Sequence, residues 1–131
     1  MKNKQAVWGA MAVAAAAVLT ACGGGGDPTP YGAIAWDAST PAAYIATNFV
    51  SQDQANAGAV ERCGGGACAV VLEFAGKGSC GALAVGGGAS LVIGVASAGT
   101  QADAEAAAVA SCSSNGGAGC AIPSAIPGKC Q

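Results

Sequence analysis

The cysteines and carboxylates of this 131-residue chain are the side chains that can carry chemistry, because the chain has no histidine. Ser-His and Cys-His nucleophile pairs and histidine metal ligands are therefore excluded. Two carboxylates can cleave a glycoside, and Asp37, Glu73 and Asp103 are the candidates. Glu73 alternates with Leu72 and Phe74, which predicts a solvated position for it. We assign no catalytic residue, no cofactor and no metal.

Six of the seven cysteines lie in the body of the chain, and an internal repeat suggests how they pair. The stretch that begins at Ser51 recurs at Thr100, an offset of 49 residues. In each copy of the repeat, one cysteine therefore lies at the end of the helix and a second lies at the start of the next strand. The predicted disulfides are Cys63–Cys68, Cys112–Cys120 and, for the remaining two, Cys80–Cys130. A four-cysteine zinc site and a redox-active thiol pair are the alternatives, but no C-x-x-C spacing occurs and exported chains meet an oxidising compartment.

The first residues have the pattern of a targeting segment. Lys2 and Lys4 precede an apolar run, and Leu19-Thr20-Ala21-Cys22 follows it. This resembles the bacterial lipoprotein signal, which implies cleavage after residue 21, lipidation of Cys22 and a membrane anchor. An ordinary secretory signal that leaves Cys22 as an odd thiol is the alternative. Residues 22–30 are a Gly/Pro tether. The residue after Cys22 is Gly23 and not an aspartate. By resemblance to the bacterial sorting rule, this favours the outer membrane of a Gram-negative host, with the domain facing the periplasm.

The elements that hold these cysteines are predicted as two strands, a helix and a third strand in each repeat. Residues 31–131 form one domain with units of about 31–79 and 80–131, and the predicted fold class is α+β. Ser51 is a helix N-cap and Gly64 ends that helix. We expect both helices to pack their alanine stripes against an antiparallel or mixed sheet built from both units.

Two further segments have a predicted conformation. The glycines at 86–88 lack the G-K-[ST] of a phosphate loop and predict a hairpin turn. Residues 120–127 contain two prolines, so this last strand is expected at a sheet edge or in an irregular conformation.

The aromatic residues lie almost wholly in the first unit. Ile34, Trp36 and Tyr44 match apolar positions of the second unit, which predicts that they fill the core. Ile45 and Phe49 match Gly94 and Ala98 instead, and they are the candidates for an exposed binding patch.

The strand motifs Gly32-Ala33-Ile34-Ala35 and Gly81-Ala82-Leu83-Ala84, together with the cysteine framework, resemble the family named domain of unknown function 4189. The resemblance covers residues 31–130 and implies a small secreted bacterial fold. It implies no activity. The prolines in the last strand depart from the pattern of the family.

Charge and composition limit the partners. Residues 22–131 carry three basic and seven acidic side chains, a net charge of −4, so nucleic acid is not expected. We expect a non-enzymatic, lipid-anchored binding or protective module of the cell envelope, such as an inhibitor of a secreted or envelope enzyme. Its partners are then the membrane and an envelope or secreted protein. The alternatives are a structural or stress-related envelope lipoprotein and a carboxylate-dependent hydrolase.

Overall fold

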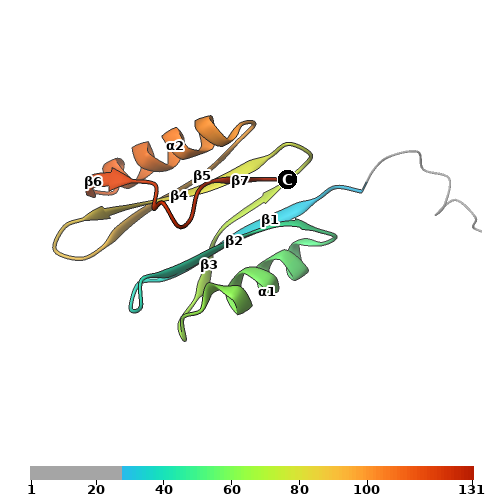
Figure 1. Cartoon of the computed structure of the whole chain (residues 1–131), viewed down its shortest axis with the longest axis horizontal. Coiled ribbons are helices and arrows are strands. Elements are labelled where there is room, and N and C mark those ends of the chain that lie inside the picture. The colour runs from blue at the N-terminus through green and yellow to red at the C-terminus, as the bar shows by residue number, and fades with distance from the viewer. Residues whose placement is uncertain (1–27) are drawn as a thin grey trace, which may run out of the picture.

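The computed structural model describes residues 28–131, which form a helix, two stacked sheets and a second helix in four layers (Figure 1). The order strand, strand, helix, strand occurs twice along the chain, and a short final strand follows. The predicted α+β class is confirmed. The elements are β1 (Tyr31–Asp37), β2 (Ala42–Phe49), α1 (Gln52–Cys63), β3 (Ala69–Ala75), β4 (Cys80–Gly87), β5 (Val92–Ala98), α2 (Gln101–Ser114), β6 (Ala118–Ala121) and β7 (Lys129–Cys130).

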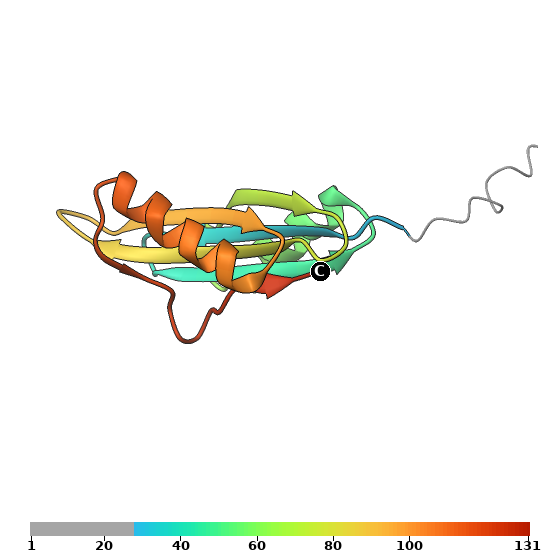
Figure 2. The same ribbon diagram turned by 90° about the horizontal axis from the view of Figure 1, so that it is seen from above.

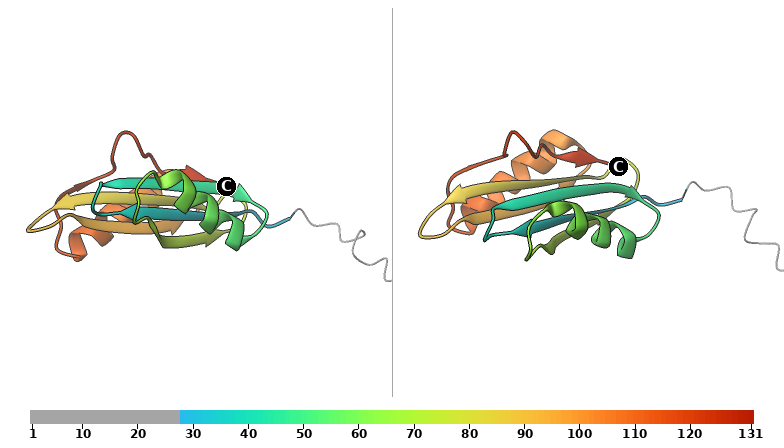
Figure 3. Two further views of the ribbon diagram at one scale, coloured as in Figure 1. Left: turned by 90° about the horizontal axis from the view of Figure 1, so that it is seen from below. Right: turned by 60° about the horizontal axis from the view of Figure 1, so that its bottom comes forward.

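Each half of the chain builds its own antiparallel sheet. The first sheet has the strand order β2-β1-β3, and the second has the order β5-β4-β6, with β7 also paired to β4. The sheets pack face to face, and each helix covers the outer face of its own sheet (Figure 1). Figure 2 shows α2 lying over its sheet, and Figure 3, seen from the opposite side, shows α1 lying over the other sheet. The expectation that both helices lie on one sheet shared by both units is therefore wrong.

The alternation of side-chain size along the central strands explains this arrangement. Successive side chains of a strand point to opposite faces. In β1, Ala33 and Ala35 are buried under α1, while Ile34 and Trp36 pack between the sheets. The corresponding residues of β4 repeat the pattern. Because each sheet has two apolar faces, one face takes a helix and the other takes the second sheet.

Small residues set the distance between each helix and its sheet. In α2, Ala104, Ala108 and Cys112 are fully buried. Gly94 of β5 lies directly below them, and a Cβ at this position would overlap the backbone of Ala108 and Cys112. The alanine-rich helix therefore lies closer to the sheet than a helix with bulky side chains could.

The helix boundaries follow from capping residues, as predicted for Ser51 and Gly64. The Ser51 hydroxyl accepts a hydrogen bond from the amide of Gln54 at 3.2 Å, and the Thr100 hydroxyl accepts one from Asp103 at 3.1 Å. Gly64 ends α1 with a φ of 85°, a conformation that glycine adopts at no steric cost. The second helix has its C-cap at Asn115 and is followed by Gly116, which has a φ of 93° and donates its amide to the Ser113 carbonyl at 3.1 Å.

The two other predicted segments also have the expected conformation. A hairpin joins β4, which ends at Gly87, to β5. β6 is four residues long and pairs only with β4, and the chain beyond Pro123 is irregular until β7 begins. The prediction of an edge or irregular segment is confirmed.

Candidate functional site

All six cysteines between residues 63 and 130 form disulfides, with the predicted pairing. Cys63–Cys68 joins the end of α1 to the segment before β3, and Cys112–Cys120 joins α2 to β6. Cys80–Cys130 joins β4 to β7. The four-cysteine zinc alternative is therefore wrong, because each of these sulfurs is bonded to another sulfur and the first two pairs belong to different halves of the molecule. The redox-active pair stays an alternative, since such a pair also forms a disulfide in its oxidised state.

Asp37 is a buried carboxylate, with only 2% of its surface exposed. Its oxygens accept hydrogen bonds from the amide and hydroxyl of Ser39 at 2.8 and 2.6 Å, from the Thr40 hydroxyl and from the Ala67 amide, both at 3.1 Å. These bonds, those from Ser39 foremost, lower the pKa of Asp37 from 3.8 to about 2. Its oxygens hold the β1–β2 turn against the Cys63–Cys68 loop, which is a structural role.

The other two carboxylates considered for hydrolysis lie on different elements. Glu73 is exposed on β3, as predicted, and accepts a hydrogen bond from the Asn56 amide at 2.8 Å. Asp103 is exposed in the first turn of α2. In the part of the chain that the structure describes, no three acidic or cysteine side chains converge on a common point.

The proposed patch of Ile45 and Phe49 is wrong, because Ile45 is 1% exposed and packs between the sheets. A β-bulge in β2, where Asn48 adopts a φ of 63°, shifts the register by one residue. Ile45 therefore pairs with Ile34 in the way that Val95 pairs with Leu83 in the other sheet. A shift of one residue moves a side chain to the opposite face.

Phe49 is also part of the core. Its ring is half-buried against the helix-facing core of the first unit, directly below Gly58 of α1, where a Cβ would contact the ring. It therefore adds little to an exposed surface.

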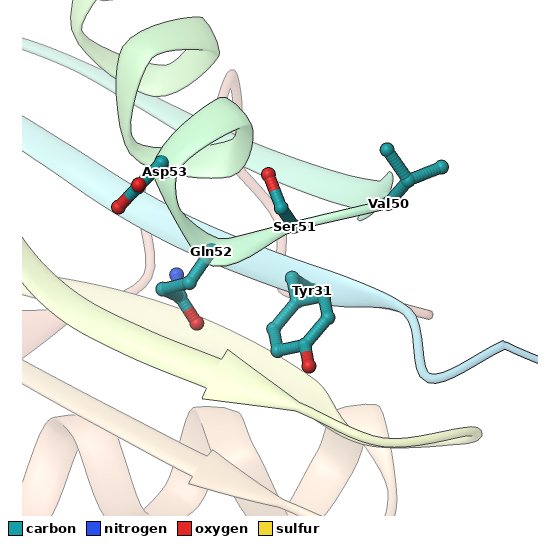
Figure 4. A pocket seen from close by; sticks show the side chains of 5 residues that line it. All are labelled: Tyr31, Val50, Ser51, Gln52 and Asp53. Atoms are coloured by element: carbon teal, nitrogen blue, oxygen red, sulfur yellow. The ribbon is translucent and has the colours of Figure 1, made fainter.

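A shallow depression of about 230 Å³ lies at the start of α1 (Figure 4). Its lining includes Val50, which is 71% exposed, and Gln52, whose amide donates to the Gly32 carbonyl and to Asn56, both at 2.9 Å. The remaining lining residues are Tyr31, Ser51 and Asp53. The side chains of Gln52 and Ser51 form local hydrogen bonds at the start of α1. These hydrogen bonds have a structural role at the helix start.

A cluster of Tyr44, Arg62 and Lys129 was not predicted from the sequence. The Arg62 guanidinium donates a hydrogen bond to the Tyr44 hydroxyl at 3.3 Å and lies 5.8 Å from the ring centroid. The Lys129 ammonium lies 5.0 Å from the same centroid. These are cation–π distances. We call these three residues the Tyr44 cluster.

The Tyr44 cluster joins both halves of the chain on the surface. Tyr44 comes from β2, Arg62 from the last turn of α1 and Lys129 from β7. Arg62 and Lys129 are exposed, and Tyr44 is half-buried. The hydrogen bond to Tyr44 is the main cause that raises the pKa of Arg62 above its ordinary value.

The described residues define a small α+β domain whose sheets and helices are fastened by three disulfides. The chain belongs to the family "Domain of unknown function (DUF4189)", whose model matches residues 31–126. The resemblance seen in the strand motifs and cysteines is thus confirmed. No curated protein and no solved structure matches the chain.

The predicted signal peptide, the lipidation of Cys22 and most of the tether fall outside residues 28–131. Within that range, neither helix has the length and apolar character needed to cross a membrane.

Proposed function

We propose that this protein is a non-enzymatic binding or protective module of the cell envelope, anchored to the membrane through lipid on Cys22. Its role is to engage an envelope or secreted protein, as an inhibitor of an enzyme does. The observation that carries the proposal is that the reactive side chains of the domain already have structural partners. The six cysteines of the domain are paired with one another, and the oxygens of Asp37 are occupied by four donors.

Rigidity supports a binding role. The three disulfides fasten both helices and the final strand to their sheets, so the backbone that carries the surface residues has little conformational freedom to lose when a partner binds. A pre-organised surface needs no catalytic group to inhibit an enzyme.

The anchor follows from the sequence. The motif Leu19-Thr20-Ala21-Cys22 supports lipidation, and the glycine-rich segment after it supports a flexible tether. The three disulfides favour an oxidising, exported environment. In a Gram-negative host the module then belongs to the outer membrane and faces the periplasm.

The experiment is capture of the partner by the full chain. An affinity tag is inserted among the tether glycines at 23–26, cells are cross-linked, and bound proteins are identified by mass spectrometry. The control carries the same tag on residues 1–30 alone, which keeps the anchor and removes the domain. We expect an envelope or secreted protein that the full chain retains and the control does not. If that partner is an enzyme, its rate should fall when the purified module is added.

An equal set of captured proteins in both samples would contradict the proposal. A purified module that hydrolyses envelope polymers would favour the carboxylate-dependent hydrolase instead.

A further inference from the structure

The Tyr44 cluster places two cations beside one aromatic ring, and within residues 28–131 neither of them forms an ion pair with a carboxylate. The described residues include six acidic side chains and three basic ones. Within residues 28–131, Arg62 and Lys129 form no ion pair, and both are directed instead at the ring of Tyr44. Among the described residues of this acidic domain, two of the three cations are therefore gathered at one exposed place. Glu61, the chain neighbour of Arg62, attracts that guanidinium without forming an ion pair with it.

The structure holds the cluster in position from both sides. The Cys80–Cys130 disulfide and the pairing of Gly81 with Lys129 fix β7 on β4. The preceding residue, Gly128, donates its amide to the Glu105 carboxylate of α2 at 2.9 Å. Lys129 is thus held at its backbone on both sides, although its side chain is exposed.

The hydrogen-bonding groups of the cluster are largely free to bind a partner. A guanidinium has five N–H donors and an ammonium has three. In the part of the chain that the structure describes, Arg62 uses its donors on the Tyr44 hydroxyl alone, and that hydroxyl accepts the bond and keeps its own proton to donate. Donors of this kind bind carboxylates through charge-assisted hydrogen bonds.

We propose that the Tyr44 cluster is the contact surface for the protein partner, and that the partner presents a carboxylate-rich segment to it. This inference rests on the proposed function, since it names the surface and the chemistry of the partner. Tyrosine and arginine are the residue types that most often dominate protein–protein interfaces. The local positive charge also directs an acidic segment to this place on a domain that elsewhere repels it.

A polypeptide fits the cluster better than a polyanion such as nucleic acid. Only Arg62 and Lys129 are gathered here, whereas a nucleic acid needs an extended run of cations. The net charge of −4 over residues 22–131 opposes a long polyanion for the same reason.

The test repeats the capture experiment with the full chain and paired variants. Arg62→Glu/Lys129→Glu reverses both charges of the cluster, and Lys77→Glu makes the same kind of change on another exposed lysine. We expect the double variant to retain at least about tenfold less partner than the unchanged chain, and Lys77→Glu to retain it within about twofold. Arg62→Gln/Lys129→Gln should lie between them, and thermal melts check that all variants fold.

The outcomes separate the two proposals. If the unchanged chain captures no partner, the proposed function and this inference both fail. If it captures a partner and the double variant captures it equally well, the function stands and the Tyr44 cluster is not its surface. Charge-dependent binding to vesicles of phosphatidylglycerol, lost in the double variant without loss of the protein partner, would assign the cluster to the lipid surface and overturn the inference.

Discussion

Gly81 of β4 lies against the ring of Phe74, which reaches it from β3 of the opposite sheet. Gly32, the partner of Phe74 in its own sheet, lies against the same ring. A Cβ on either glycine would overlap the ring. The two Gly-Ala-Ile/Leu-Ala motifs therefore start with glycine because one buried phenylalanine fills the space between the sheets at both places.

Gly81→Ala is expected to lower the free energy of unfolding by about 1–3 kcal/mol, the usual cost of overpacking a core. The control is Gly99→Ala, because a Cβ at Gly99 would have no neighbour within 4 Å. Urea denaturation of both variants measures the difference. Equal losses would show that Phe74 can move aside.

Asp37→Asn should destabilise the protein most near neutral pH. A lowered folded-state pKa means that the ionised carboxylate contributes stability above its ordinary pKa of 3.8, and that this contribution is lost as pH falls toward about 2. The stability gap between wild type and variant should therefore narrow over that interval in urea denaturation. Hydrogen bonds from Gln101 and Gly128 also lower the pKa of Glu105, so some pH dependence persists in the variant.

The control for this prediction is Glu61→Gln, which alters an exposed carboxylate on α1. The free energy of unfolding of this variant should differ little from that of the wild type at every pH. A gap for Asp37→Asn that stays constant between neutral pH and about pH 2 would contradict the assigned role.

The elements and the disulfides could be predicted because their signals are local or repeated. Ser51, Thr100 and Gly64 are capping residues wherever such helices occur, and the repeat assigned four of the cysteines by analogy. The order of the layers was not predicted. β1 has an alanine face and an isoleucine–tryptophan face, and the sequence shows that both are apolar. It does not show which face is covered by a helix and which by the second sheet.

The surface could not be predicted in the same way. The repeat aligned Ile45 with Gly94, but the bulge at Asn48 shifts that part of β2 by one residue. The Tyr44 cluster depends on β7, which reaches β2 only in the folded state and has no counterpart in the first unit. No spacing along the chain relates Lys129 to Tyr44.

Cys22→Ser should remove the protein from the membrane fraction or leave its signal peptide uncleaved, because the serine hydroxyl cannot take the place of the thiol in the lipoprotein pathway. Membrane fractionation and the intact mass of the product check this. A change at Thr20 to serine keeps the motif and serves as the control. Unchanged fractionation and unchanged mass of the Cys22 variant would exclude the lipid anchor.

The three disulfides should differ in their contribution to stability. Cys80–Cys130 closes a separation of 50 residues, whereas Cys63–Cys68 closes one of five and Cys112–Cys120 one of eight. Chain entropy then predicts that Cys80→Ala/Cys130→Ala costs about 2 kcal/mol more than Cys63→Ala/Cys68→Ala. Cys112→Ala/Cys120→Ala should lie within about 0.5 kcal/mol of the latter, since the two short loops differ little in length.

Urea denaturation of the three double variants decides this order. Reduction of the unchanged protein should also raise its intact mass by about six hydrogens, one for each sulfur of the three disulfides.

The long-range Cys80–Cys130 bond has a second effect, because its loss frees β7 from β4 and with it the backbone of Lys129. The Cys80→Ala/Cys130→Ala variant should therefore lose stability and weaken partner capture. Cys112→Ala/Cys120→Ala, whose bond holds no residue of the Tyr44 cluster, should lose less stability and retain capture. Equal stability losses in all three would mean that native packing, and not restriction of the unfolded chain, sets the contribution of each disulfide.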